Sequence, residues 1–379
     1  MKTNLSSVFT VEIRKKGILA MRTKEENICL IQALSNANGV SGFEDEVAEL
    51  GRKETEAYCN VTIDSLRNTY MSLKNNRKQP CKVWIDAHSD EVGYIVQAIK
   101  PNGTMNFLTI GGSDISSLPS NKVRVQTAKG EYIPGIITSK PPHFVSAAEK
   151  NQGRILSDLA IDVGAVSAQD LKENFQIRMA APVVPDVTCT YDETHDLFMG
   201  KAFDCRIGCA ALIETLNQLS TEMLDVDVEA TLTVQEEVGE RGSMAAVDNI
   251  DADVCIVFEG CPADDTFSPD YLIQAALRKG PMLRHFDCSM ITNPRFQRFA
   301  LDLGEELGIP VQESVRSGGG TNGKYIHASR HGVPTIVIGI PVRYIHSHHG
   351  ICTLEDYENA VKLAVEIVKR LNEETIRSF

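Results

Sequence analysis

The sequence is poor in aromatic residues and in positive charge. Only one of its 379 residues is tryptophan, and aromatic residues together make up 6%. Lysine and arginine number 38 against 51 aspartates and glutamates, which gives a formal net charge of −13. Such a field repels phosphate backbones and anionic headgroups, so we expect neither nucleic acid nor a membrane surface to be the main partner.

Long hydrophobic runs are missing as well. No apolar stretch approaches the roughly 20 residues of a bilayer-spanning helix, and the N-terminus lacks a hydrophobic segment followed by a small-residue cleavage site. The ten cysteines are scattered without a CxxC pair, which indicates reduced thiols rather than a disulfide framework. We therefore expect a cytoplasmic protein. Cys205 and Cys209 have no second pair at zinc-finger spacing, so no structural zinc site is predicted there.

The spacing of hydrophobic residues differs between regions of the chain. Residues 1–20 alternate only weakly and form an N-terminal extension. Residues 94–190 consist of short strand-like runs joined by turns, which predicts an inserted β domain. Residues 21–93 and 191–379 alternate between helices and buried strands, and this predicts one α/β domain with a mixed sheet covered by helices on both faces. The predicted helices and strands of this domain are 25–37, 44–58, 82–87, 207–219, 228–234, 253–258, 295–307, 335–340 and 354–372.

Polar side chains stand where these apolar strands are predicted to stop. Ligands of α/β sheets bind outside the carboxyl ends of the strands, and the candidates there are His88, Asp90, Asp204, Glu236, Glu237, Glu259 and His346. A single carboxylate at a strand end is commonly a helix cap or a solvated loop residue. Two histidines with several carboxylates are instead the ligands of two divalent ions such as zinc, cobalt or manganese. Four converging carboxylates need such ions to stay ionised together.

Four strings of residues resemble the tetrahedral (TET) aminopeptidases, the glutamyl aminopeptidase-like family of dinuclear metallopeptidases, some of which were once labelled endoglucanases. The strings are HSDEVG at 88–93, KAFDCRIG at 201–208, QEEVGERG at 235–242 and PVRYIHS at 341–347. The likeness extends from about Met21 to the C-terminal helix and leaves residues 1–20 outside it. It implies a zinc-peptidase-like α/β catalytic domain with a small β-barrel inserted at 94–190.

The resemblance also implies the function and the role of each site residue. The chain would be a hydrolase, a metal-dependent aminopeptidase acting on short peptides with a free N-terminus, and would self-associate, up to a tetrahedral dodecamer, partly through the insertion. Two ions per subunit, zinc or cobalt before manganese, would be held by His88 and Glu259 on one side, Glu237 and His346 on the other, and Asp204 between them. Glu236 would be the general base, and Asp90 would orient His88.

Three places depart from the family pattern. Glu259 stands where the family often has aspartate, and Asn322 stands where many members have aspartate. His348, His349 and Gly350 replace a Pro-x-Glu ending. A longer carboxylate still coordinates metal, and we expect the two histidines to be surface residues or neighbours of the ligands rather than ligands themselves. These departures leave the preferred N-terminal residue open.

Other functions remain to be weighed against an aminopeptidase. A deacylase acting on a non-peptide amide would use the same site. A glycoside hydrolase would need two carboxylates flanking a sugar bond and no metal, and a non-catalytic scaffold would not need Glu236 beside five candidate ligands. Gly318, Gly320 and Gly323 match GxGxxG, but Arg343 stands where a dinucleotide site needs an acidic residue.

Overall fold

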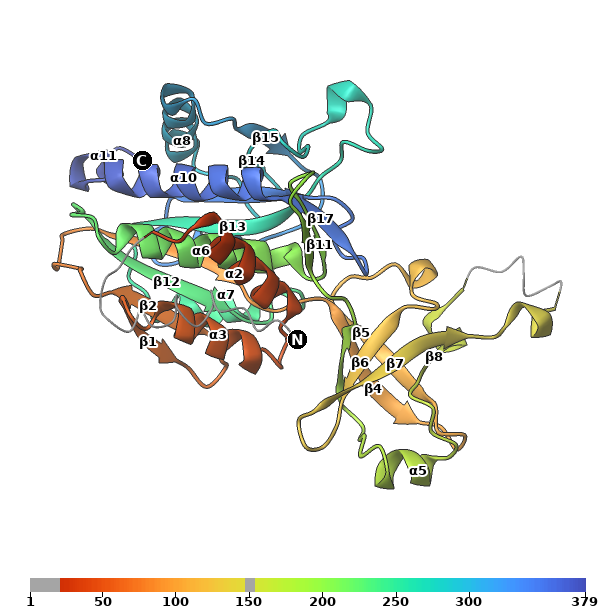
Figure 1. Ribbon diagram of the computed structural model, residues 1–379. Coiled ribbons are helices and arrows are strands. Elements are labelled where there is room, and N and C mark those ends of the chain that lie inside the picture. Colours follow the sequence, from red (N-terminus) through yellow and green to blue (C-terminus); the bar gives the residue numbers. More distant parts are fainter. Residues whose placement is uncertain (1–20, 147–153) are drawn as a thin grey trace.

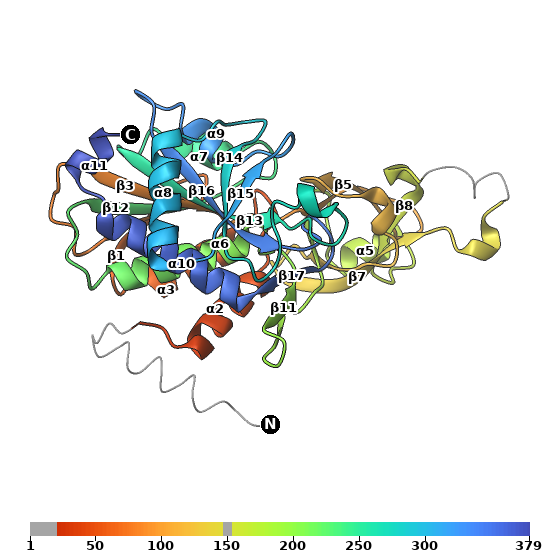
Figure 2. The same ribbon diagram turned by 90° about the horizontal axis from the view of Figure 1, so that it is seen from above.

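The computed structural model describes residues 21–146 and 154–379, so the predicted extension at residues 1–20 lies outside the described residues. An α/β domain forms the larger part, and a β-barrel stands at one side of it (Figure 1). The view from above shows the same separation between the two parts (Figure 2).

An eight-stranded mixed sheet forms the centre of the α/β domain, in the order β1-β2-β12-β3-β13-β16-β14-β15. The four central strands run parallel to one another. Nearly every residue of β3 and β13 is buried, as expected for strands covered on both faces. The strand bounds are Cys59–Ile63 (β1), Thr69–Leu73 (β2), Lys82–His88 (β3), Asp227–Thr233 (β12), Val254–Pro262 (β13), Met282–Phe286 (β14), Gln312–Val315 (β15) and Thr335–Val342 (β16).

Helices cover both faces of this sheet, which confirms the predicted fold class. Alternate residues of β13 belong to different cores: Ile256 packs in the larger apolar cluster, and Val257 packs in a smaller one with Trp84. The larger cluster lies under α2 (Lys24–Asn36), α3 (Asp45–Thr55), α6 (Phe203–Leu219), α8 (Pro294–Leu307) and α10 (Leu354–Arg370). Residues of α7 (Arg241–Ala246) and α9 (Gly323–Ile326) line the smaller one, and α11 (Glu373–Arg377) ends the chain.

The inserted segment closes into a six-stranded antiparallel barrel, as the sequence predicted. Its strand order is β4-β5-β8-β7-β6-β9, and a core of its own includes Val123, Ile137 and Ile161. The barrel elements are Gly93–Ile99 (β4), Met105–Ile110 (β5), Lys122–Gln126 (β6), Tyr132–Ser139 (β7), Leu159–Asp162 (β8), Pro182–Pro185 (β9) and the short helix Ala168–Glu173 (α5). A small third sheet of β10 (Thr190–Asp192), β11 (Leu197–Gly200) and β17 (Gly350–Thr353) packs against the α/β domain, whose larger apolar cluster includes Phe198 and Cys352.

Some elements extend further than the sequence pattern indicated. β13 runs to Pro262 rather than 258 because it stays paired with β16 as far as Val342, so Glu259 lies inside the strand. α6 begins at Phe203 rather than 207, although Asp204 keeps a non-helical conformation with φ −85° and ψ 103°.

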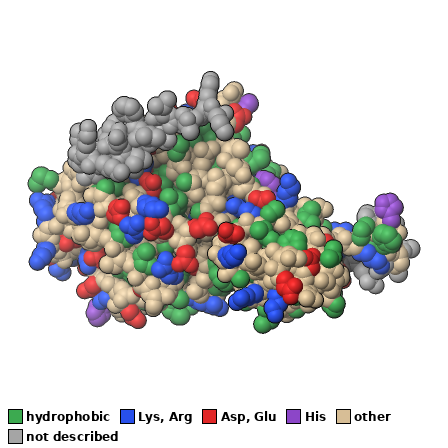
Figure 3. All heavy atoms as spheres, turned by 60° about the horizontal axis from the view of Figure 1, so that its bottom comes forward, with side chains coloured by type: hydrophobic (Ala, Val, Ile, Leu, Met, Phe, Trp, Pro, Cys, Tyr) green, Lys and Arg blue, Asp and Glu red, His purple; other side chains and the backbone are tan. Residues whose placement is uncertain are grey.

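Figure 3 shows one face of the molecule with side chains coloured by type. Acidic and basic side chains are interspersed over the described part of the face in Figure 3. None of the helices within residues 21–146 and 154–379 has the length and apolar character needed to cross a bilayer.

Candidate active site

All seven predicted site residues converge at the carboxyl edge of the central strands. His88 is the last residue of β3, and it lies beside Thr233, the last residue of β12. Glu236 and Glu237 follow β12 in the next turn, and Glu259 lies in the neighbouring strand β13. The parallel strands therefore deliver their polar ends to one place. Asp204 and His346 complete the site from α6 and from the segment between β16 and β17.

One cluster of ligand atoms forms around His88. Its Nε2 lies 3.0 Å from Oδ1 of Asp204 and 3.5 Å from Oε2 of Glu259. Cys205 lies within the same group, but its thiol donates a hydrogen bond to the carbonyl of Phe258. Burial raises the pKa of this thiol well above its usual value, which disfavours the thiolate form in which cysteine binds metal.

A second cluster forms around His346. Its Nε2 lies 3.1 Å from Oδ2 of Asp204 and 3.4 Å from Oε2 of Glu237. Asp204 therefore presents one oxygen to each cluster. This is the arrangement expected of a carboxylate between two ions.

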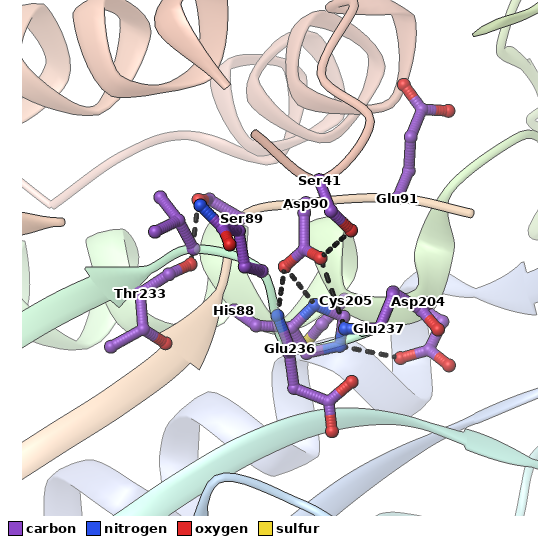
Figure 4. A network of polar contacts seen from close by, with 12 residues as sticks. Ser41, His88, Ser89, Asp90, Glu91, Asp204, Cys205, Thr233, Glu236 and Glu237 are labelled. Atoms are coloured by element: carbon purple, nitrogen blue, oxygen red, sulfur yellow. Dashed lines mark hydrogen bonds and ion pairs between the residues drawn. The ribbon is translucent and has the colours of Figure 1, made fainter. Parts of the chain in front are cut away.

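Asp90 organises the turn that carries both glutamates (Figure 4). Its Oδ1 accepts the backbone N–H of Glu236 at 2.9 Å, and its Oδ2 accepts that of Glu237 at 3.1 Å and the hydroxyl of Ser41 at 2.6 Å. The sequence predicted Asp90 only as a partner of His88, whose Nδ1 lies 3.3 Å from Oδ1. The additional role escaped prediction because it depends on backbone amides. No local pattern pointed to Ser41.

The carboxylate of Glu236 is turned away from Asp90 (Figure 4). Burial, followed by the charges of Glu259 and Glu237, raises its pKa well above the usual value. It belongs to a group of possible ligands with His88 and Glu237. A carboxylate in this position can bind a cation or move a proton at the cluster.

The electrostatics of the site fit divalent cations. Burial and the charge of Asp204 raise the pKa of Glu237 to about 8. Burial lowers the pKa of His346, but the hydrogen bond to Asp204 and the charges of Glu237 and Asp204 together outweigh this, and the pKa is raised to about 9. Oε1 atoms of Glu237 and Glu259 are buried without a hydrogen-bond partner among the described residues. Bound cations would satisfy both oxygens and keep the carboxylates ionised.

The barrel reaches the site through the glycines that follow β5. The carbonyl of Gly112 accepts a hydrogen bond from Nδ1 of His346 at 3.1 Å, which leaves Nε2 of a neutral ring for metal. A Cβ on Gly112 would lie 3.1 Å from that nitrogen, and a Cβ on Gly111 would lie 3.2 Å from Glu237. The sequence did not predict this contact, because a Gly-Gly pair indicates only a turn.

The positions that depart from the family pattern make other contacts. His348 donates from Nε2 to the carbonyl of Lys122 in the barrel at 2.7 Å, and its Nδ1 lies 3.2 Å from Nδ1 of His349. Asn322 donates to Asp86 at 2.7 Å and to Thr233 at 2.6 Å. It therefore supports the strands β3 and β12 from behind the site.

A cavity of about 420 Å³ opens over the two clusters. Its walls include His88, Asp204, Glu236, Glu237, Glu259 and His346. The candidate ligands and the candidate base therefore face a common space in which a small part of a peptide can lie.

Comparisons with known proteins relate the chain to aminopeptidases. The family described as M42 glutamyl aminopeptidase matches residues 68–363. The lysyl aminopeptidase of Pyrococcus furiosus is 31% identical over 350 residues, which cover 90% of this chain and 96% of that protein.

Two solved structures show the same fold over nearly the whole chain. The crystal structure of the TET aminopeptidase from a marine sediment archaeon, Thaumarchaeota archaeon SCGC AB-539-E09, has a TM-score of 0.90 and 35% identity, covering 93% of this chain and 99% of that chain. The TET1 peptidase of Pyrococcus horikoshii, described as able to assemble into a tetrahedron or a large octahedral shell, has a TM-score of 0.81 and 26% identity, covering 91% and 100%.

Proposed function

The chain belongs to the M42 glutamyl aminopeptidase family and is a metallo-aminopeptidase; on this premise we propose that it removes single residues from the free N-terminus of short peptides with two divalent ions per subunit. The observation that supports this most directly is the position of Asp204, whose two oxygens face two different histidines, His88 and His346, each with a further carboxylate beside it. A site for one ion would need only one of these clusters.

Each of the two ligand clusters would hold one of the two ions. His88 and Glu259 would hold one ion, Glu237 and His346 would hold the other, and Asp204 would contact both. When bound, the ions lower the pKa of a water molecule and polarise the scissile carbonyl. Imidazole nitrogens mixed with carboxylates suit zinc or cobalt, with manganese as the next choice.

Glu236 acts as the general base and then as the general acid. It takes a proton from the attacking water and later gives that proton to the leaving amine. Asp90 acts through the backbone, because its two oxygens hold the amides of Glu236 and Glu237. These bonds fix the base and a ligand on one rigid turn.

The proposal extends to assembly and location. We expect a homo-oligomer, up to a tetrahedral dodecamer, in which the barrel at residues 94–190 makes part of the contacts and residues 21–93 and 191–379 carry the catalysis. The assemblies named for the TET1 peptidase support this. The ten cysteines are all unpaired, which supports a reducing compartment such as the cytoplasm. Native mass spectrometry of the purified full chain tests the assembly.

A peptide time course tests the reaction. The metal-loaded protein is incubated with one short peptide in free and in N-acetylated form, and products are followed by mass spectrometry while bound metal is counted by elemental analysis. We expect successive losses of single residues from the free form alone, with two ions per subunit. Internal cuts or equal digestion of both forms would contradict an aminopeptidase, and release of the acetyl group alone would identify a deacylase.

A further inference from the structure

One buried carboxylate beside the site has no role in the proposed mechanism. Glu44 directly precedes α3 and is fully buried. It occupies the N-cap position of that helix, yet its side chain makes no capping hydrogen bond. Burying a charged group costs free energy unless the group is paired. The helix alone therefore does not account for a glutamate at this position.

Glu44 contacts the turn that carries the two adjacent glutamates of the site. Its Oε1 accepts the backbone N–H of Gln235 at 3.1 Å and that of Gly42 at 2.8 Å. Gln235 directly precedes Glu236, the proposed general base. Glu44 therefore joins the start of α3 to the residue next to the base.

Glu44 and Asp90 together hold three successive amides of this turn. Gln235 donates to Glu44, and the next two residues donate to the two oxygens of Asp90 at 2.9 and 3.1 Å. Successive backbone N–H groups that converge in this way form a concave site for anions. The side chain of Glu236 projects away from Asp90 (Figure 4). The amides and the carboxylate of the base thus point in different directions.

The backbone of Gln235 needs such support. Its φ is +55°, in the left-handed region that residues other than glycine rarely adopt. A conformation of this kind persists only where neighbouring groups hold it in place. The backbone N–H of Arg241 donates to the carbonyl of Gln235 at 3.2 Å, and Glu44 accepts from its amide. Both polar backbone groups of Gln235 are thereby fixed.

Half of the Glu44 carboxylate is left without a partner. Within residues 21–146 and 154–379, no group donates a hydrogen bond to Oε2, which is buried. Burial, followed by the charge of Asp90, raises the pKa of Glu44 to about 7. The fold thus keeps an unfavourable carboxylate here, and the contact that this carboxylate makes outside its own segment is the amide of Gln235.

We propose that Glu44 is a positioning residue for the general base. By holding the amide of Gln235, it fixes the turn in the conformation that directs the carboxylate of Glu236 into the cavity. The inference rests on the proposed aminopeptidase function and adds a residue that acts on turnover without touching metal or substrate. Its task differs from that of Asp90, which also holds the amide of the candidate ligand Glu237.

Two substitutions at Glu44 separate its acceptor oxygen from its charge. Glu44→Ala removes the acceptor, so kcat should fall about 10- to 100-fold, the scale of loss for a misplacement of about 1 Å. KM and the content of two ions per subunit should stay at the wild-type level, because Asp90 still holds the next two amides. Glu44→Gln should keep most of the wild-type kcat, because a neutral oxygen still accepts the N–H of Gln235, although less strongly than a carboxylate.

Hydrogen exchange followed by mass spectrometry measures the turn without relying on turnover. In the metal-loaded protein, peptides that cover residues 234–238 should exchange faster in Glu44→Ala than in wild type, because the amide of Gln235 loses its acceptor. Glu44→Gln should exchange like wild type in these peptides.

Asp356 provides a matched control. It is a fully buried carboxylate in the first turn of α10, and it also accepts two backbone N–H groups, from Arg278 and Gly280, each at 2.8 Å. Asp356→Ala should lower the free energy of unfolding, as Glu44→Ala does. It should leave kcat and the exchange of residues 234–238 unchanged.

The positioning role is refuted if Glu44→Ala keeps the wild-type kcat, if Glu44→Gln loses as much activity as Glu44→Ala, or if Asp356→Ala lowers kcat to the same extent. Unchanged exchange of residues 234–238 in Glu44→Ala refutes it independently of any peptidase assay. If the metal-loaded wild type cleaves no peptide, the proposed function fails, whereas faster exchange in Glu44→Ala would still show that Glu44 holds the turn.

Discussion

The α/β domain and the barrel differ in where their strands end. In the α/β domain, β3, β12 and β13 run parallel and stop at one edge, so His88, Glu237 and Glu259 meet there. In the barrel, neighbouring strands are antiparallel, so successive strands end at opposite rims. Parallel order thus concentrates polar side chains from distant parts of the sequence, whereas the barrel offers only its connecting turns.

The barrel nevertheless touches the site through backbone. A Cβ on Gly111 would lie 3.2 Å from Glu237 and a Cβ on Gly112 would lie 3.1 Å from His346, closer than most Cβ contacts in proteins. Substitutions in the α/β domain should therefore change the chemistry, and substitutions in the barrel should change metal affinity or stability.

The largest effect is expected at Asp204. Asp204→Asn replaces a charge shared by two clusters with a neutral amide, so both metal occupancy and activity should collapse. Elemental analysis and a peptidase assay on the same sample measure this. Asp302→Asn, an exposed position on α8 with a 63% exposed side chain, is the control and should be silent. If Asp204→Asn still bound both ions fully, Asp204 would not be a ligand shared by the two clusters.

The next effect is expected at Glu236. Glu236→Gln keeps the size of the side chain but cannot take a proton, so turnover should fall about 10²- to 10⁴-fold while both ions stay bound. Metal content and kcat are compared with wild type. Loss of an ion would instead make Glu236 a ligand and would reverse the roles of the two adjacent glutamates.

A smaller effect is expected at Asp90. Asp90→Asn can keep only part of the acceptor set for the amides of Glu236 and Glu237, so metal affinity should weaken about 10- to 100-fold. Competition with a chelator measures the affinity without relying on turnover. Ser41→Ala removes only one of the hydrogen bonds to Asp90 and should weaken metal affinity less. An equal loss of metal affinity in both variants would show that the hydrogen bonds that Asp90 accepts from the two backbone amides contribute little to metal binding.

Much of this arrangement could be predicted from the sequence. The buried strand before His88 and the helical pattern after Asp204 are local signals, and they place polar residues at strand ends. Glu259 was found by the same reasoning, although its strand continues three residues beyond it through pairing with β16. This pairing depends on a segment that is distant in the sequence, so no local pattern predicts where the strand ends.

Contacts made by backbone or by remote partners could not be predicted. Gly112 offers a carbonyl, which every residue possesses, so its identity says nothing about His346. Arg284, in the short strand β14, and Arg316, directly after the short strand β15, stand in segments without a strong hydrophobic pattern, and the cavity that both line exists only after the sheet is assembled. The sequence therefore predicts which candidate ligands come together better than it predicts the groups that orient them.

The barrel contact itself is tested at Gly112. A Cβ there would lie 3.1 Å from Nδ1 of His346, so Gly112→Ala should push the ring and weaken metal affinity by about tenfold, the lower end of losses caused by disturbing a partner of a ligand. Gly135→Ala is a matched control, since its Cβ would lie 3.1 Å from a methyl group of Val163. Chelator competition should separate the two variants; equal affinities would mean that the barrel does not position His346.

The smallest effect on activity is expected from the core of the barrel. Ile137 is fully buried there, and Ile207 is fully buried in α6 close to Asp204. Truncation of either to alanine should cost about 2–5 kcal/mol of stability, because each leaves a cavity in an apolar cluster. The consequences for the site should differ. A cavity at Ile207 lets the segment that carries Asp204 shift, so metal affinity should fall together with stability.

Ile137→Ala should instead leave kcat/KM of the folded, metal-loaded protein within about twofold of wild type, since the barrel core is a separate cluster. Urea denaturation followed by circular dichroism measures the loss of structure. Fluorescence of Trp84, the single tryptophan and a residue of β3, reports on the α/β domain alone. We expect the circular dichroism transition of Ile137→Ala to begin at lower urea than the Trp84 transition. Coincident transitions, or a loss of metal affinity equal to that of Ile207→Ala, would show that the two parts unfold and act as one unit.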